Sequence, residues 1–287
     1  MKRTLMIDGD IMIFQIGRVT EDITDFGDQT MESYDMESAI RLVNHELDQI
    51  SKKTGYKREE LVVALSSDKN FRKRFFPTYK TNRKHIRKPL GLKAMREYLL
   101  ENMEEYNTVM IEEFEADDVM GMYGTAPKDL LDQEIAIYSQ DKDLFTIPCK
   151  QWDFKKGKFI KPTQEESTRF LYKQVLMGDA VDGYKGCPKI GKIKAERALK
   201  DCESETEMLK ECHKLYFKAY GETAKDELLK QLGQARILHY ADTQLLMMHD
   251  MLYNPYDMIP INPDTLKKWE GEVGETKRKR NNKEVQS

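Results

Sequence analysis

The sequence has 287 residues, of which 39% are hydrophobic and 34% are charged, and its formal net charge is −3. A chain of this length can bury a substantial core, and no apolar stretch approaches the roughly 20 residues that a membrane-spanning helix needs. The four cysteines are isolated along the chain, which argues against a zinc finger, and Asp8 follows the start too closely for a signal peptide, so we expect an intracellular, cytoplasmic protein.

Apolar runs of strand length alternate with helical patterns over the first 162 residues. We predict strands over residues 4–8, 61–65, 108–111 and 134–138, and a hairpin from residues 152–154 and 158–160. Helices are predicted over residues 36–52, 92–103 and 116–123. This alternation predicts an α/β domain with a central, mostly parallel sheet that is flanked by helices.

The pattern changes after residue 162. Thr163 and Glu166 form a capping-box pattern ahead of an apolar run, and the chain then has a helical pattern to about residue 252. We therefore divide the chain into an α/β domain over residues 1–162, which includes a basic segment at about 69–92, and a helical region over residues 163–270. The tail, residues 271–287, is expected to be disordered.

Positive and negative charges are segregated along the chain. Between residues 71 and 88 there is no acidic side chain, and the cations are Arg72, Lys73, Arg74, Lys80, Arg83, Lys84, Arg87 and Lys88. Between residues 101 and 118 the sign reverses. Such segregation suits a protein that binds phosphates in one place and metal cations in another. Pro77 and Pro89 prevent the basic segment from forming one unbroken helix.

Acidic motifs adjoin the predicted strands and the start of the helical region. Their members are Asp8, Asp68, Glu115, Asp117, Asp118, Asp141, Asp143, Asp179 and Asp182. Each alone has an ordinary explanation as a helix cap or turn former. If the strands form one sheet, however, these carboxylates meet at the edge where α/β proteins place their sites.

A cluster of this kind requires cations. Two carboxylates about 4 Å apart repel by about 4 kcal/mol at an effective dielectric near 20. Oxygen ligands without His or Cys favour Mg²⁺, with Mn²⁺ as a substitute, over zinc. Paired ions of this type promote phosphodiester hydrolysis. Asp10 could join the cluster, but we favour a helix N-cap for it.

The motifs, taken in order, resemble a known superfamily. The strings MIDGD, YKTNRK, FEADDVMG, SQDKDLFTI and MGDAVDGYKG resemble the flap endonuclease/5′→3′ exonuclease superfamily, in particular the stand-alone 5′→3′ exonucleases of short-tailed bacteriophages. The resemblance spans about residues 4–200 and resumes at residues 233–240. It implies a PIN-like 5′-nuclease fold and a two-metal hydrolysis of duplex DNA from 5′ ends. It also implies a role in phage DNA replication, recombination or host DNA degradation inside the infected bacterial cell.

The resemblance also implies residue roles. Asp8, Asp68, Glu115 and Asp117 match ligands of a first metal ion, and Asp118 matches an adjacent acid. Asp141, Asp143, Asp179 and Asp182 match those of a second ion. Lys80 and Arg83 match the basic pair of a helical arch that contacts the scissile phosphate. The other cations of the basic segment are expected to contact DNA, and Tyr79 either stacks on a terminal base or packs within the arch.

Residues 178–199 resemble the helix–hairpin–helix of the same family. Backbone N–H groups at such a turn bind duplex phosphates without reading sequence. Lys189 stands where the family usually has Gly, and Ile193 where Lys is common, which argues against a monovalent cation in this loop. The expected phosphate contacts are Gly186, Lys189, Gly191, Lys192 and Lys194, although the three lysines are also compatible with plain solvation.

Three other functions remain open at this point. The same acids would serve a structure-specific flap endonuclease or a nuclease that removes RNA primers by an RNase H-type activity. A 3′→5′ proofreading nuclease also uses carboxylates and two metals, but it lacks the basic segment. A non-catalytic DNA-binding scaffold should have lost carboxylates, and none of the matched positions is replaced. The oligomeric state stays open, with a monomer preferred.

Overall fold

The computed structural model describes residues 2–242, and these form two compact units. The first unit comprises residues 2–74, 83–163 and 237–242, and the second comprises residues 75–82 and 164–236. The predicted tail at 271–287 and the end of the predicted helical region lie outside the described residues. Within the described part, no helix combines the length and the apolar character needed to cross a membrane.

A six-stranded sheet forms the centre of the first unit. Its strand order is β5-β4-β1-β6-β7-β8. All neighbouring pairs are parallel except β7 with β8, which confirms the predicted mostly parallel sheet. The strands span β1 Lys2–Asp8, β4 Leu61–Leu65, β5 Thr108–Met110, β6 Gln133–Tyr138, β7 Lys150–Asp153 and β8 Lys158–Ile160.

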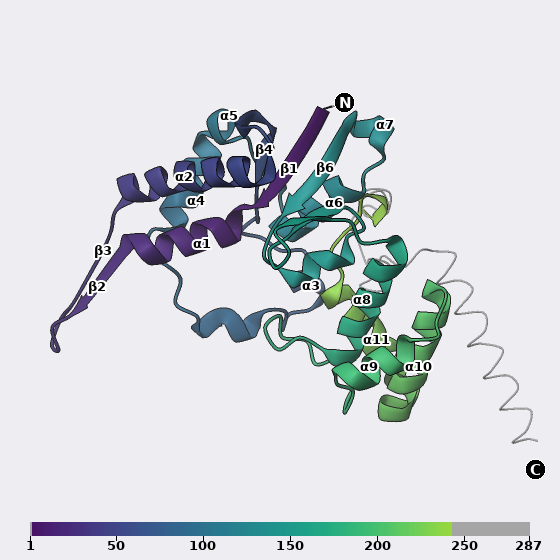
Figure 1. Ribbon diagram of the computed structural model, residues 1–287. Helices are drawn as coiled ribbons and strands as arrows, with labels where there is room; N and C mark the ends of the chain where they lie inside the picture. The colour runs from purple at the N-terminus through teal and green to yellow at the C-terminus, as the bar shows by residue number, and fades with distance from the viewer. Residues whose placement is uncertain (1, 243–287) are drawn as a thin grey trace, which may run out of the picture. The chain divides into compact units, whose positions relative to one another are not determined.

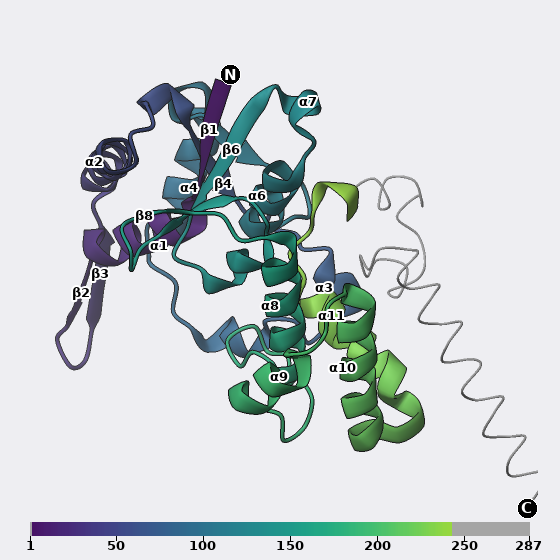
Figure 2. The same cartoon turned by 45° about the vertical axis from the view of Figure 1, so that its right-hand side comes forward.

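Helices cover both faces of this sheet. Figures 1 and 2 show α1 (Gly9–Thr20), α2 (Met36–Thr54) and α4 (Leu92–Glu101) on one face, and α6 (Ala116–Thr125) on the other. Alternate residues of β1 point to opposite faces of the sheet. Leu5 and Ile7 pack on the face that α1, α2 and α4 cover, and Met6 is buried on the other face. Short helices α5 (Met103–Tyr106) and α7 (Lys128–Leu131) precede β5 and β6.

Helix α2 shows how the sequence sets its boundaries. Asp35 caps its start by accepting a hydrogen bond from the Ser38 N–H at 2.9 Å. Gly55 ends it in the left-handed region (φ 73°), where a residue without Cβ is favoured. Between these caps, Val43, Leu47 and other apolar residues at helical spacing face the core.

A two-stranded hairpin joins α1 to α2 and was not predicted. It consists of β2 (Glu21–Asp25) and β3 (Thr30–Tyr34), and it projects from the ends of the two helices (Figures 1 and 2). Glu21 holds its base in place, because this carboxylate accepts hydrogen bonds from Arg18, from Arg87 and from the Leu90 N–H. The strands carry few apolar residues, so the pattern gave no strand signal.

The basic segment forms short pieces, as its prolines predict. Helix α3 (Arg72–Phe75) ends before Pro77, and a 3₁₀ turn η2 (Thr81–His85) ends before Pro89. Residues 75–82 pack with the second unit, and the residues on either side of them belong to the first.

Four helices, α8 (Gln164–Met177), α9 (Lys192–Leu199), α10 (Glu205–Tyr220) and α11 (Ala224–Ala235), build the second unit. Their shared core contains Tyr172, Val175 and Tyr216, and the buried Tyr216 hydroxyl donates to the Val175 carbonyl at 2.7 Å. Gly178 and Gly186 cross closely between α8 and α9: a Cβ on Gly186 would lie 2.2 Å from the Gly178 nitrogen. Both positions therefore require glycine.

Residues 237–242 return to the first unit after α11. The Leu238 N–H donates to Asp118 at 3.0 Å, and the Tyr240 N–H donates to the Thr125 hydroxyl at 2.7 Å. The Leu238 carbonyl lies so close to Gly121 that a Cβ there would be 2.4 Å from it. This contact falls where the sequence resemblance resumes, at residues 233–240.

Candidate functional site

Acidic residues follow three neighbouring strands of the first unit at their carboxyl ends. Asp8 ends β1, Asp68 lies just beyond β4, and Asp141 lies just beyond β6. Because β4, β1 and β6 are adjacent and parallel, these three positions share one edge of the sheet. Glu115, which precedes α6 in the connection from β5 to β6, completes the acids expected there.

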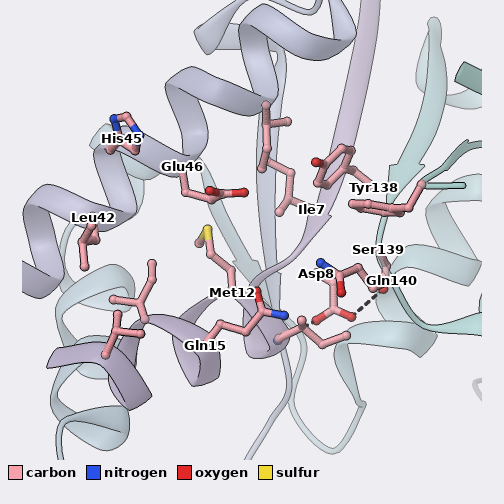
Figure 3. A pocket seen from close by; sticks show the side chains of 15 residues that line it. Ile7, Asp8, Met12, Gln15, Leu42, His45, Glu46, Tyr138, Ser139 and Gln140 are labelled. Atoms are coloured by element: carbon pink, nitrogen blue, oxygen red, sulfur yellow. Dashed lines mark hydrogen bonds between the residues drawn. The ribbon is translucent and has the colours of Figure 1, made fainter. Parts of the chain in front are cut away.

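Asp8 is buried and fully engaged by hydrogen bonds. Its carboxylate accepts from the Ile11 N–H at 3.0 Å, which caps α1, and from the Ser139 hydroxyl at 2.8 Å (Figure 3). Burial is the main cause that raises the pKa of Asp8 to about 6; the charges of Asp10 and Asp141 act in the same direction, and the two hydrogen bonds act against it. This carboxylate is ionised at neutral pH only at a cost that a nearby cation would remove.

Asp10 has a different role from the one predicted. The N-cap of α1 is Asp8, so the N-cap prediction for Asp10 was wrong. Asp10 lies in the first turn, and its carboxylate faces the end of β4, where it accepts from the Ser66 N–H at 3.2 Å. Burial raises the pKa of Asp10, and the Glu115 charge adds to the shift. Asp10 therefore belongs to the acidic edge.

Two serines that were not predicted as site residues hold these acids in place. Ser139 binds Asp8, and the Ser66 hydroxyl accepts from the Ala116 N–H at 2.9 Å, which ties β4 to the start of α6. Both serines directly follow a predicted strand at the carboxyl edge. That position is the sequence signal that could have identified them.

Arg72 and Asp118 form a buried ion pair in the first unit. Two guanidinium nitrogens of Arg72 donate to the two oxygens of Asp118 at 2.5 and 2.6 Å, and Glu115 accepts a third bond at 3.1 Å. The exposed fraction is 2% for Arg72 and 0% for Asp118. Arg72 was expected to contact DNA, and burial contradicts that expectation. Asp118 serves as the counter-ion of Arg72, because the guanidinium contacts both of its oxygens and balances its charge in a site closed to solvent.

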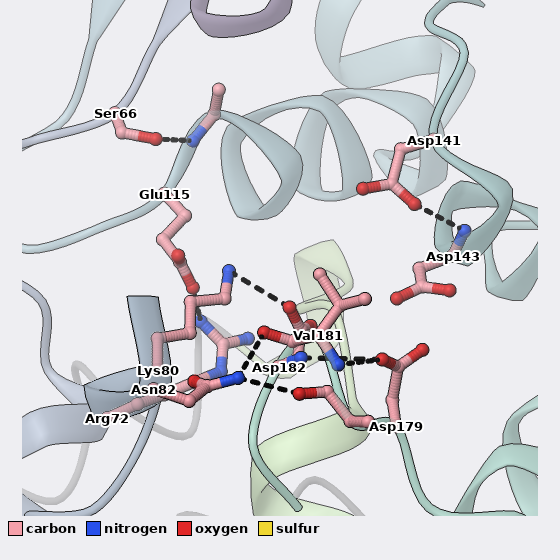
Figure 4. A network of polar contacts seen from close by, with 12 residues as sticks. Ser66, Arg72, Lys80, Asn82, Glu115, Asp141, Asp143, Asp179, Val181 and Asp182 are labelled. Carbon is pink, nitrogen blue, oxygen red and sulfur yellow. Dashed lines mark hydrogen bonds and ion pairs between the residues drawn. The ribbon is translucent and has the colours of Figure 1, made fainter. Parts of the chain in front are cut away.

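The remaining acids of the first unit lie at or near the protein surface. Asp68 is exposed and accepts from Arg96 at 2.5 Å. Asp141 caps the 3₁₀ turn η3 (Lys142–Thr146) by accepting from the Asp143 N–H at 2.8 Å (Figure 4). Asp143 is half-buried, and Asp117 is half-buried in the first turn of α6.

Asp179 and Asp182 belong to the second unit, in the turn that follows α8. Asp179 is buried and accepts from the Val181 N–H at 2.7 Å. The Lys80 ammonium lies 3.9 Å from the Asp182 carboxylate, and the Asn82 amide donates to the Ala180 carbonyl at 2.6 Å (Figure 4). The family-matched lysine is thus held beside a family-matched acid.

The other cations of the basic segment differ in whether they form an ion pair and in how exposed they are. Arg74 pairs with Glu113 at 2.6 Å and Arg87 pairs with Glu21, although both side chains stay partly exposed. Lys73, Lys84 and Lys88 are exposed and Arg83 is half-buried. Tyr79 is buried, which agrees with the alternative that it packs within the segment and contradicts base stacking in this conformation.

The loop between α8 and α9 presents lysines but not every predicted backbone donor. Gly186 is buried and its N–H donates to Gln231 at 2.9 Å, so the predicted phosphate contact at Gly186 is contradicted. Lys189 has a left-handed backbone (φ 64°), the conformation that a glycine adopts without cost. Of the predicted phosphate contacts, Lys189 and Gly191 in the loop and Lys192 and Lys194 at the start of α9 are exposed.

The donor set at the sheet edge fits a hard divalent cation. The side chains are carboxylates without His or Cys. Asp68 and Glu115 have guanidinium partners in Arg96 and Arg72, whereas the pKa of Asp8 is raised mainly by burial. Among residues 2–242, no three acidic, His or Cys side chains converge closely enough to hold a metal ion.

Comparison with known proteins places this arrangement in a family. Residues 3–173 match the family described as 5′-3′ exonuclease, N-terminal resolvase-like domain. An exodeoxyribonuclease of Enterobacteria phage T3 is 28% identical over 284 residues, covering 88% of this chain and 93% of its own. An exonuclease of Escherichia phage T7 is 26% identical over 284 residues, covering 88% and 94%.

A solved structure shares the fold. The flap endonuclease of bacteriophage T5, in a pseudo-enzyme-product complex with DNA and metal ions, superposes with a TM-score of 0.54 at 16% identity, covering 96% of this chain and 98% of that one. The family match covers more than half of the present sequence and includes every acid of the sheet edge. The chain therefore belongs to the 5′-3′ exonuclease family.

Proposed function

We propose that this protein is a divalent-metal-dependent 5′→3′ exodeoxyribonuclease that hydrolyses phosphodiester bonds from the 5′ ends of duplex DNA. The observation that supports it most is the buried Asp8 beside Asp10 and Asp141 at the carboxyl edge of a 5′-3′ exonuclease domain. The phage relatives are named for exonuclease activity and match over most of both chains. The site of action would be the cytoplasm of an infected bacterium.

The proposal assigns two Mg²⁺ ions to the carboxylates. Asp8, Asp68, Glu115 and Asp117 would hold the first, with Asp10 close by, and Asp141 and Asp143 would serve the second. Asp179 and Asp182 belong to the other unit, and their role as metal ligands remains the expectation drawn from the family resemblance. When bound, the ions activate a water and stabilise the leaving oxygen. The T5 flap endonuclease, named as a complex with metal ions and DNA, supports both the ions and the substrate.

The chain's own residues orient the acids and the phosphate. Ser139 and the Ile11 N–H fix the rotation of the Asp8 carboxylate. The Lys80 ammonium, loosely paired with Asp182 at 3.9 Å, offsets charge that develops on the phosphoryl oxygens. Arg83 can hold a phosphate through two N–H groups, and the exposed lysines at 189, 192 and 194 would bind the duplex without reading its sequence.

A double substitution tests the catalytic proposal. Asp141→Ala with Asp143→Ala should abolish Mg²⁺-dependent release of 5′-labelled nucleotides while binding to the same duplex largely survives. Asp129→Ala, an exposed acid on α7, is the matched control and should cleave like the parent. Full activity of the double variant would reject the proposal and support a DNA-binding scaffold.

Lys80 provides a second test. Lys80→Ala should lower kcat much more than it raises the Kd for duplex DNA, because the ammonium acts on charge that forms during the reaction. Lys128→Ala, at an exposed cation on α7 outside the basic segment, is the control. Equal losses of rate and binding in Lys80→Ala would contradict the assigned role.

A structure-specific flap endonuclease is the second candidate. The named activity of the T5 structure favours it, since the fold is shared. Blunt, recessed and flapped duplexes, each labelled at the 5′ end, distinguish the two activities by product length: an exonuclease releases short products, and a flap endonuclease releases the whole flap. A substrate with an RNA 5′ segment tests primer removal.

A further inference from the structure

A cavity of about 230 Å³ opens beside Asp8 in the first unit (Figure 3). Helices α1 and α2 form two of its walls, and the ends of β1 and β6 form the others. Figure 3 shows Met12 and Glu46 pointing into the space between the two helices.

The walls of the cavity are mainly apolar, and polar side chains lie at intervals along them. The apolar lining includes Ile11, Met12, Ile16 and Leu42, and Tyr138 and Phe154 add aromatic rings that pack edge to face at 4.8 Å. The polar lining residues are Asp8, Gln15, His45, Glu46, Ser139 and Gln140. This composition resembles that of small-molecule sites, in which apolar walls surround a few oriented polar groups.

The polar groups select the kind of ligand. Glu46 and Asp8 are carboxylates, His45 is an imidazole, and no Lys or Arg lines the cavity. A phosphate would be repelled by the two acids unless a bound cation lay between them, so the cavity itself favours an uncharged group. An uncharged flat ring with N–H groups on its edge would be accepted, because Glu46 can accept from those donors and the Gln15 and Gln140 amides can both donate and accept.

The size agrees with one ring system. At about 30 Å³ for each water, the cavity corresponds to roughly eight water molecules. That volume suits a single heterocycle rather than a whole nucleotide, whose sugar and phosphate would remain outside. The outside position is next to Asp8, where the proposed function places the phosphate that is cleaved.

We propose that this cavity binds the nucleobase of a nucleotide that adjoins the scissile phosphate. The inference rests on the proposed nuclease function and adds a base-binding pocket to it. Stacking a base against apolar and aromatic walls is tolerant of sequence, whereas Glu46 favours bases with N–H donors on the exposed edge. The pocket thus positions the phosphate by holding the base next to it.

The test fills the pocket and removes the base in turn. Leu42→Trp fills it from α2, and Gln15→Trp fills it from an exposed position on α1, where folding is not at risk. Each should lower kcat/KM on an ordinary 5′-labelled duplex about tenfold, the effect of losing one stacked base. Asp48→Trp, an exposed residue of α2 outside the pocket, is the control for the new indole.

Duplexes with one abasic nucleotide remove the base instead of filling the pocket. Two such duplexes are needed, with the abasic nucleotide on either side of the first scissile phosphate. One of the two should be cleaved by the parent enzyme about tenfold more slowly than the ordinary duplex. On that substrate the Trp variants should lose nothing more. Equal losses on ordinary and abasic substrates, or no loss in either Trp variant, would overturn the inference.

A binding measurement without metal separates this inference from the proposed function. A duplex with 2-aminopurine at the affected position should gain fluorescence on binding the parent protein, because the base leaves the stack of the duplex, and should not gain it on binding Leu42→Trp. If the parent raises the fluorescence but never cleaves in Mg²⁺, the nuclease proposal fails and the pocket stands. If the parent cleaves and gives no greater rise than Leu42→Trp, the pocket proposal fails alone.

Discussion

Replacing Asp118 with asparagine tests whether this acid binds metal or supports the fold. The sequence placed Asp118 beside the metal ligands, but the structure surrounds it with donors. One oxygen accepts from Arg72 at 2.6 Å and from the Leu238 N–H at 3.0 Å. The other accepts from Arg72 at 2.5 Å and from the Glu115 N–H at 3.3 Å. Asparagine keeps the shape but removes the charge and turns one acceptor into a donor.

The expected loss of stability is large. Breaking a buried ion pair by removing one partner costs about 3–5 kcal/mol, because Arg72 would stay buried with Glu115 as its remaining acidic contact. With a shift of about 2–4 °C for each kcal/mol in a chain of this size, Tm should fall by roughly 6–20 °C. The Leu238 contact should be lost as well, so the return segment at residues 237–242 should become more accessible to protease.

Thermal and urea unfolding followed by circular dichroism give the answer. Asp129→Asn, the same chemical change at an exposed acid, should leave both midpoints unchanged. A double variant, Arg72→Met with Asp118→Leu, should recover much of the stability, because an apolar pair replaces the ion pair. Parent-like stability of Asp118→Asn together with lost cleavage would refute this reasoning and restore Asp118 as a metal ligand.

Three further predictions concern the lysine loop, the hairpin and the salt response. Lys189→Gly should raise the free energy of unfolding by about 1 kcal/mol, because a left-handed backbone costs a residue with a Cβ about that much. The same variant should bind the duplex more weakly. A lower free energy of unfolding would contradict the claim that the Lys189 backbone is strained. Arg87 lowers the pKa of Glu21 from 4.5 to about 2, so the contribution of this ion pair to stability is present above pH 4.5 and is lost as the pH falls toward 2. The Tm of Glu21→Gln should lack that pH dependence. If Tm varied with pH in the same way in the variant and the parent, the pair would not contribute to stability. Duplex Kd should rise steeply with salt in a log–log plot, and Lys192→Ala should reduce the slope by about one; an unchanged slope would remove Lys192 from the interface.

The sheet could be predicted from the sequence because its strands are strongly patterned. The run at residues 61–65 is apolar throughout, as a strand buried on both faces must be, and β4 spans those same residues. The hairpin β2–β3 could not be predicted, because its sequence is polar and its position depends on Glu21 contacts with a segment about 66 residues further along.

The sequence indicated which residues lie near the candidate site better than it indicated which partners they contact. Asp8 and Asp141 were found because a strand end places them at one edge. Arg72 was misassigned because a count of charges cannot show that Asp118, 46 residues away, buries it. Gly186 was misassigned because its N–H partner, Gln231, lies in a different helix. Burial and long-range pairing are properties of the fold, and local sequence does not carry them.

The return of residues 237–242 to the first unit has a consequence for synthesis. A ribosome releases the acids of the sheet edge long before it releases Leu238, whose N–H completes the shell around Asp118. A nascent or prematurely terminated chain that ends near residue 173, where the family match stops, contains the N-terminal acidic motifs but lacks the return segment at residues 237–242. In such a fragment Asp118 lacks one of its hydrogen-bond donors, so its N-terminal unit should unfold more readily than that of the whole chain.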